Sequence, residues 1–323
     1  MCTAVTYRTG DFYFGRNLDL DRSYGEEVVV MPRHFPVSLR HGDRLERHHA
    51  IIGMAHVADG QPLYYDGMNE KGLCAAGLNF VGNAHYGKPV PDRENITHFE
   101  VIPWILARCA TVDEAAEKLE HANIVDTPFS GELPVSQLHW MISDFARSIV
   151  LESTREGLKL WDNPVGVLTN NPPFDRQLFG LTRYMGLSAG DPENRFAPWL
   201  PLEPYSLGMG ALGLPGDLSS ESRFVRAAFV KHNSVSGVSE EESVSQFFHI
   251  LGSVEQTNGC CRVGDGYERT VYSSCCNAGK GIYYYTTYGT RQITGVNLFR
   301  EALDGTKIAR YPLELRQQIR WEN

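Results

Sequence analysis

Segments rich in β-forming residues alternate along the chain with segments that carry the apolar spacing of helices. At the N-terminus, residues 2–8 (CTAVTYR) and 12–16 (FYFGR) are rich in β-branched and aromatic residues. Residues 9–11 (TGD), which lie between them, are typical of a turn. The pattern therefore predicts a β-hairpin that begins with the second residue of the chain.

Two further blocks have the same β-rich character. The first covers residues 137–169, and the second consists of segments 271–277, 281–289 and 292–299. Only short polar or glycine-containing turns separate the segments within each block, and such turns join antiparallel strands. We therefore expect antiparallel sheets.

Between these blocks, the apolar spacing and the cap residues predict helices. Thr111 followed by Glu114 forms a capping box, and Ser239 followed by three glutamates is a second start signal. Serines 219–220 are expected to cap another helix. The predicted helices cover residues 98–109, 112–122, 221–232 and 240–252.

Residues 190–217 are rich in proline and glycine and predict a long ordered loop. Within it, GMGALG at 208–213 matches the glycine pattern of dinucleotide-binding loops. Those glycines act between a buried strand and a helix start, whereas here Pro215-Gly216 follow where the helix would begin. We interpret this segment as a loop that needs small residues.

The order β, α, β, α, β with antiparallel strands favours a layered α/β (α+β) fold over a doubly wound parallel sheet. No internal repeat or linker divides the chain, so we expect one domain over residues 1–323. The composition, with 42% hydrophobic and 21% charged residues, is that of an ordinary globular protein.

Charge and composition exclude several classes of function. Acidic residues outnumber basic ones by 39 to 30, which argues against binding to nucleic acid. No apolar run approaches the roughly 18 residues of a membrane span, and charged residues within the first twenty argue against a secretory signal. Seven cysteines, without Cys-x-x-Cys or His-Glu-x-x-His spacing, favour neither a disulfide framework nor a zinc site. We expect a cytoplasmic protein without a membrane partner.

Cys2 is the most informative single residue. Initiator methionine is commonly removed before a small residue, and loss of Met1 would leave Cys2 with a free α-amine. Such an amine has a pKa of about 7.7–8.0 and can take the proton of the thiol on the same residue. Nucleophile and base would then need no histidine. Alone, a cysteine at this position is a weak signal.

Arg16 and Asp19 lie in the returning half of the predicted hairpin, within FGRNLD. A guanidinium near a thiol favours the thiolate, and a carboxylate near an ammonium group orients it and stabilises its charge. A surface ion pair at the end of a hairpin is the alternative interpretation. The local sequence leaves both open.

Several blocks in one order now resemble a known family: MCTAVTY…FGRNLD, NEKGL…AGLNF at 69–80, LHWMISD at 138–144, GVLTNNPPFD at 166–175, GLPGDLSSESRFVR at 213–226, and GIYYYTTY. Together they resemble the choloylglycine hydrolase family of N-terminal nucleophile hydrolases. The resemblance implies an α-β-β-α sandwich, in which two antiparallel sheets lie between helix layers. It also implies that no metal or organic cofactor is needed.

The resemblance assigns Cys2 as the nucleophile, with its own amine as general base and later general acid. Arg16 and Asp19 would flank it.

Asn79 and Asn170 would line the oxyanion hole, because fixed amide N–H groups stabilise a tetrahedral oxyanion. Arg223 would complete the charged network around the thiolate. Without the resemblance, Asn170 in Asn-Asn-Pro is typical of a turn, and Arg223 is typical of a solvated helix face.

Conjugated bile salts and penicillin V are the two substrate classes of the family. Asn79 resembles the bile salt hydrolases, since penicillin V acylases tend to have tyrosine there. The positions that line the family's pocket suit an apolar acyl group with a few hydroxyls, although each could equally be a core residue. They are Leu18, Tyr24, Tyr65, Phe129 and Leu133.

The resemblance thus implies hydrolysis of glycine- or taurine-conjugated bile acids through a Cys2 thiolate and an acyl-enzyme thioester. We expect a homo-oligomer, since family members are often tetramers, and an active protein that begins at Cys2. The choice between glycine and taurine is expected to lie in loops near 81–86, 127–136 and 205–213. The alternatives are a penicillin V acylase of the same mechanism, a non-catalytic binder of amphipathic acids, and a cysteine hydrolase that uses an internal histidine.

Overall fold

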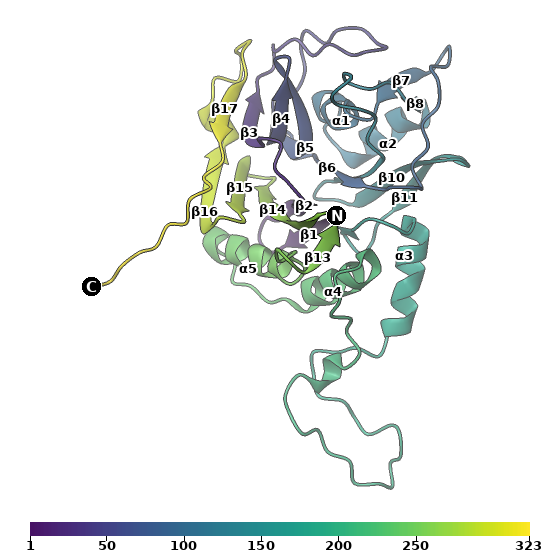
Figure 1. Cartoon of the computed structure of the whole chain (residues 1–323), viewed down its shortest axis with the longest axis vertical. Coiled ribbons are helices and arrows are strands. Elements are labelled where there is room, and N and C mark those ends of the chain that lie inside the picture. Colours follow the sequence, from purple (N-terminus) through teal and green to yellow (C-terminus); the bar gives the residue numbers. More distant parts are fainter.

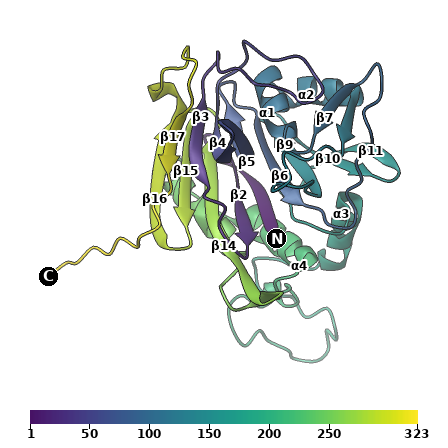
Figure 2. The same ribbon diagram turned by 45° about the horizontal axis from the view of Figure 1, so that its top comes forward.

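The computed structural model describes residues 1–323, and its centre is a pair of antiparallel β-sheets that lie face to face (Figures 1 and 2). The first sheet has the order β12 (Val167–Leu168), β1 (Cys2–Arg8), β2 (Phe12–Leu20), β14 (Gly266–Asn277), β15 (Ile282–Thr287) and β16 (Thr290–Asn297), with β13 (Cys261–Val263) paired to β14. The second has the order β11 (Gly157–Asp162), β10 (Ser148–Thr154), β9 (Leu138–Ser143), β6 (Cys74–Asn79), β5 (Gln61–Asn69), β4 (Ile51–Ala58), β3 (Glu27–Met31) and β17 (Ala309–Pro312).

Helices cover the outer face of each sheet (Figure 1). The helices α4 (Ser220–Asn233) and α5 (Glu240–Gly252) pack on the first sheet, and α1 (Val101–Arg108) and α2 (Val112–Glu120) lie over the second. A short pair, β7 (Glu94–Thr97) and β8 (Ala122–Val125), is parallel because α1 and α2 form the crossover between its strands. The architecture is the α-β-β-α sandwich that the resemblance implied.

Strand β3 shows how one strand serves both interfaces of the second sheet. Val28 and Val30 belong to the core between the two sheets, whereas Val29 and Met31 belong to the core under α1 and α2. Successive side chains of a strand point to opposite faces, and both faces are buried here. A strand buried on both faces has a continuous apolar sequence instead of an alternating one.

The predicted hairpin is confirmed, but its second strand continues beyond residue 16 to Leu20. The β-rich blocks and the four helices are also confirmed, with ends shifted by a few residues. The sequence analysis missed β3 to β6, which form half of the second sheet, and the helix α3 (Phe174–Gly180). None of the helices combines the length and apolar character that crossing a membrane requires.

The cap predictions had mixed outcomes. The Thr111 side chain accepts the Glu114 amide, and Ser239 forms a complete capping box with Glu242. The expectation for serines 219–220 was wrong. Ser219 occupies the N-cap position, but its side chain makes no cap hydrogen bond. The Ser220 hydroxyl instead accepts the backbone N–H of Asn170, in the site described below.

Residues 190–217 form a loop, as predicted, that extends away from the sandwich as an arm at the bottom of Figure 1. GMGALG contains only a short 3₁₀ turn, Met209–Ala211, and neither follows a buried strand nor starts an α-helix. The arm carries large apolar side chains that are at least 80% exposed: Phe196, Trp199, Tyr205 and Leu207.

Candidate active site

Cys2 is the first residue of β1, which lies between β12 and β2 in the first sheet, and only 2% of it is exposed. The hairpin register places Leu18 opposite Cys2 and Arg16 opposite Ala4. Asp19 follows Leu18 on the same strand, and its backbone N–H donates to the Met1 carbonyl. The hairpin therefore brings Arg16 and Asp19 beside the nucleophile candidate.

Asn170 lies next to Cys2 because β12, which ends two residues earlier, pairs with β1. The Cys2 backbone N–H donates to Oδ1 of Asn170 at 2.8 Å. The same oxygen accepts a hydrogen bond from Nη2 of Arg223 at 2.7 Å. Ser220 holds the Asn170 backbone by accepting its N–H at 2.8 Å. These contacts fix the amide side chain against the residue 2 nitrogen.

Arg223 comes from α4 and is completely buried. Its Nη1 donates to the Cys2 carbonyl at 2.5 Å and to Oγ1 of Thr3 at 2.6 Å. The same nitrogen lies 4.0 Å from the Asp19 carboxylate. The alternative of a solvated helix residue is therefore wrong for Arg223, which joins the helix layer to the start of β1.

Asp19 is also completely buried. One carboxylate oxygen accepts the Thr270 hydroxyl at 2.7 Å, and the other has no hydrogen-bond partner. Burial raises the pKa of Asp19, an effect that the neighbouring Arg223 opposes. Burial likewise lowers the pKa of Arg223, which Asp19 opposes. The alternative interpretation of Arg16 and Asp19 as a surface ion pair is therefore wrong, because both side chains are completely buried.

Arg16 crosses the space between the sheets. Its Nη1 donates to the carbonyls of Tyr65 and Gly77 on the second sheet, at 3.1 and 2.5 Å. Its Nη2 is buried without a hydrogen-bond partner. Burial alone would lower the pKa of Arg16, but the acidic groups around it, among them Cys2 and Asp66, raise it. Arg16 therefore keeps its positive charge in the interior.

Asn79 lies at the end of β6 and is half-buried. Its carbonyl accepts Nδ2 of Asn170 at 2.8 Å. Asn79, Cys2 and Arg16 line one cavity of about 510 Å³. The two asparagines are therefore joined directly, and Asn170 also bonds to the nucleophile candidate.

All five predicted pocket residues line this same cavity: Leu18, Tyr24, Tyr65, Phe129 and Leu133. Thirteen of its 22 lining residues are hydrophobic, so the wall suits an apolar ligand. Three loops were expected to determine the choice between glycine and taurine. Of these, only the segment 127–136 contributes to the lining of the cavity, and neither 81–86 nor 205–213 does.

Asp66 is a buried carboxylate that the sequence analysis missed. It accepts the hydroxyls of Tyr272, Tyr283 and Ser274 at 2.5, 2.8 and 2.8 Å. Burial raises its pKa, while Arg16 and the three hydroxyls oppose that change. In the sequence, Asp66 could have been suspected only from the aspartate within the β-rich segment YYDGMN and from the tyrosines and serines of the last β-rich block.

Histidines make no hydrogen bond with Cys2. His139, the most buried candidate, bonds instead to Glu152 and to the Thr169 carbonyl. This arrangement argues against a hydrolase that uses an internal histidine as its base. The structure contains no cluster of three or more histidine, cysteine, aspartate or glutamate side chains arranged to hold a metal ion.

A sequence model of the family described as linear amide C–N hydrolases, choloylglycine hydrolase family, matches residues 2–311. This chain belongs to the choloylglycine hydrolase family. It is 55% identical to a bile salt hydrolase/transferase from Lactiplantibacillus plantarum, over 98% of each chain. It is 40% identical to a bile salt hydrolase/transferase from Clostridium perfringens, over 96% of each.

Solved structures agree with this membership of the choloylglycine hydrolase family. A mutant of the conjugated bile acid hydrolase from Clostridium perfringens superimposes with a TM-score of 0.92, at 38% identity over the whole of both chains. Penicillin V acylase from Agrobacterium tumefaciens superimposes with a TM-score of 0.74, at 20% identity over 96% of this chain and 90% of that one. The second likeness shows the shared fold alone.

Proposed function

We propose that this enzyme hydrolyses the amide bond of glycine- or taurine-conjugated bile acids. Family membership makes it an amidohydrolase of linear amides. The relatives that cover nearly its whole length are bile salt hydrolases. The single observation that supports this substrate best is that Cys2 lies in the largely apolar cavity together with Asn79 and the five pocket residues.

The proposed reaction begins after Met1 has been removed from Cys2. The new α-amine lies where the Cys2 N–H now donates to Asn170, so Asn170 would orient it. The amine takes the thiol proton, and the thiolate attacks the carbonyl carbon of the substrate amide. Arg16, which lines the cavity with Cys2, and Arg223, which bonds to the Cys2 carbonyl, supply buried positive charge near the developing negative charge.

The tetrahedral intermediate carries an oxyanion that needs fixed hydrogen-bond donors. Nδ2 of Asn170 has two hydrogens, and only one is used in the bond to the Asn79 carbonyl. The second hydrogen and the Asn79 side-chain amide are the donors we assign to the oxyanion.

Collapse of the intermediate breaks the C–N bond, and the protonated amine of Cys2 gives its proton to the leaving glycine or taurine. The products of this half are the free amino acid and a thioester between Cys2 and the bile acyl group. Water, deprotonated by the Cys2 amine, then releases the bile acid. Attack by an amine in place of water would give a new amide, which matches the word transferase in the names of both relatives.

Penicillin V acylase is the second candidate, since it needs the same chemistry on a phenoxyacetyl amide. Turnover of glycocholate, taurocholate and penicillin V by one preparation separates the two, with Cys2→Ser as the control that removes the thiol. We expect kcat/KM to be much higher for at least one bile salt than for penicillin V. The reverse order would reject the bile salt assignment, and retained binding with no turnover would identify a non-catalytic binder.

We also propose that copies of this chain associate, as a tetramer, and that the protein works in the cytoplasm as one domain. The exposed aromatic and aliphatic side chains of the arm support association, because several large apolar side chains on one loop are more exposed than a single chain in water favours. A second copy of the chain is the partner we assign to the arm.

A further inference from the structure

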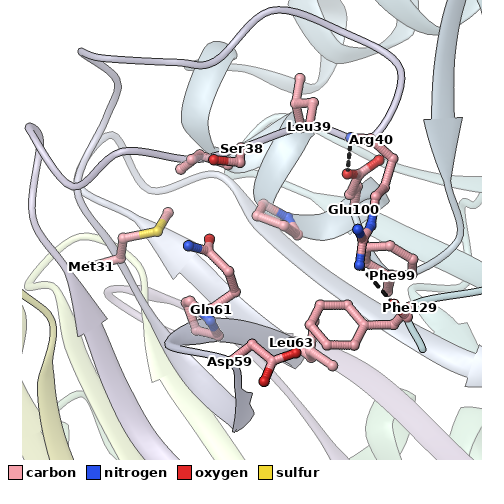
Figure 3. Close-up of a pocket in the computed structure, with 13 residues that line it drawn as sticks. Met31, Ser38, Leu39, Arg40, Asp59, Gln61, Leu63, Phe99, Glu100 and Phe129 are labelled. Atoms are coloured by element: carbon pink, nitrogen blue, oxygen red, sulfur yellow. Dashed lines mark hydrogen bonds between the residues drawn. The ribbon is translucent and has the colours of Figure 1, made fainter. Parts of the chain in front are cut away.

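A second cavity, of about 450 Å³, lies behind the wall of the substrate cavity (Figure 3). Leu63, Phe99 and Phe129 line both cavities and therefore form the wall between them. The rings of Phe99 and Phe129 meet edge to face, with their centroids 5.2 Å apart. The position of Phe129 thus decides the shape of the substrate cavity on this side.

Arg40 holds Phe129 from the rear cavity, outside the substrate cavity. Its Nη2 donates to the Phe129 carbonyl at 2.7 Å, and its guanidinium lies 5.1 Å from the centre of the Phe129 ring (Figure 3). The Arg40 backbone is fixed in turn, because its N–H donates to Oε1 of Glu100 at 2.7 Å. Glu100 is buried and precedes the first residue of α1.

The pocket loop, residues 126–137, joins β8 to β9 without a helix or strand of its own. Only two hydrogen bonds connect its central residues 127–134 to the rest of the chain. One is the bond from Arg40 to Phe129, and the other joins His41 to Thr127 at 2.8 Å. Both come from the neighbouring residues 40 and 41, so this single segment fixes the centre of the pocket loop.

We propose that Arg40 is a positioning residue that determines how tightly the enzyme binds the acyl part of its substrate. Arg40 acts through Phe129: it keeps the ring against Phe99 and so keeps the wall closed against the steroid. Leu133, which is carried by the same loop, is positioned with it. This inference rests on the proposed function for the identity of the acyl group.

The test compares Arg40→Ala with Arg44→Ala. Arg44 is an exposed arginine of the same segment that pairs with Glu46, and it makes no hydrogen bond to the pocket loop. For Arg40→Ala, KM for glycocholate should rise about three- to tenfold, since a charge-assisted hydrogen bond is lost at an exposed position. Its kcat should change less than about twofold. Arg40→Lys, which keeps the cation, should recover part of the loss.

Two further measurements, proteolysis of the pocket loop and alkylation of Cys2, separate three cases. These are a positioning role of Arg40, general damage to the fold, and failure of the proposed function. Chymotrypsin should cut Arg40→Ala faster after Phe129 than it cuts wild type or Arg44→Ala. Alkylation of Cys2 by iodoacetamide should proceed at the wild-type rate, because the nucleophile is untouched. The proteolysis comparison holds even if wild type fails to hydrolyse glycocholate, a result that would reject the proposed function and not the role of Arg40 in the loop.

Equal chymotrypsin cleavage of the Arg40→Ala and Arg44→Ala variants would overturn the positioning role. Faster cleavage with an unchanged KM for glycocholate, in a wild type that turns this substrate over, would overturn the role in substrate binding. Slower Cys2 alkylation in Arg40→Ala would also count against the proposal, because the effect would then reach beyond the pocket loop.

Discussion

Oδ1 of Asn170 accepts the backbone N–H of Cys2 at 2.8 Å, although 168 residues separate the two in the sequence. The bond is possible because β12 pairs with β1 and delivers Asn170 to the start of the chain. It joins the nitrogen that would become the free amine to the side chain that we assign to the oxyanion hole. One asparagine can therefore serve both the base and the intermediate.

Asn170→Ala should reduce turnover of a conjugated bile salt by roughly a hundredfold to a thousandfold, the usual loss for one oxyanion donor. Thermal melting should show that the variant remains folded. Asn171→Ala is the matched control, because Asn171 bonds to the Val81 carbonyl and not to Cys2. A loss of less than about threefold for Asn170→Ala would remove it from the oxyanion hole.

Arg16→Leu should lower kcat/KM by about tenfold to a hundredfold, since a buried charge interaction with the nucleophile is lost. Arg16→Lys should be impaired less, because an ammonium keeps the charge but cannot donate from two separate nitrogens, as Arg16 does from Nη1 to Tyr65 and Gly77 and from Nε to Asn17. Arg8→Leu, at the exposed end of β1, the strand paired with that of Arg16, should match wild type. Wild-type activity in Arg16→Leu would exclude Arg16 from the mechanism.

His98 should make the fold sensitive to acid. Burial lowers its pKa from the ordinary value of 6.5 to about 4, and its Nε2 accepts the Ser136 amide at 3.2 Å. Because the pKa is lower in the folded state than in the unfolded state, neutral His98 stabilises the fold above about pH 6.5. That contribution is lost as the pH falls toward 4.

The free energy of unfolding can be measured by denaturant titration between about pH 7 and pH 4, which spans the ordinary and the lowered pKa of His98. Over this interval it should fall more steeply for wild type than for His98→Gln. His121→Gln, at an exposed position after α2, is the control and should follow wild type. Parallel curves for wild type and His98→Gln would show that His98 does not cause the acid sensitivity.

The arm should control association. Light scattering should give wild type the mass of a tetramer, whereas the pair Trp199→Ser and Leu207→Ser should shift it toward the monomer. Both side chains are more than 80% exposed in the single chain, so their loss should leave its folding stability nearly unchanged. A monomeric wild type, or a tetramer that survives both substitutions, would contradict the role of the arm.

Local sequence was sufficient for the hairpin and for helices with clear start signals. Residues 9–11 mark the turn, and Ser239 with Glu242 marks a helix start that the structure reproduces. Strands β3 to β6 were missed because several of their residues are buried on both faces, so that Val28 to Met31 form a continuous apolar run without alternation.

The candidate site depended on contacts that no local pattern encodes. Arg16 and Asp66 lie on different sheets, and the hydroxyls that hold Asp66 come more than 200 residues later. Asn170 reaches Cys2 through a strand of only two residues. These residues could be brought together from sequence only through the resemblance to a family, and Asp66 was not among those it assigned.

The central claim is that the free α-amine of Cys2 is the catalytic base, and the state of Met1 tests it most directly. While Met1 is present, the Cys2 nitrogen belongs to a planar amide that cannot take a proton from the thiol. Intact-mass measurement of the fraction whose Cys2 reacts with substrate should therefore show a chain that has lost Met1. Full turnover by protein shown to retain Met1 would contradict the account.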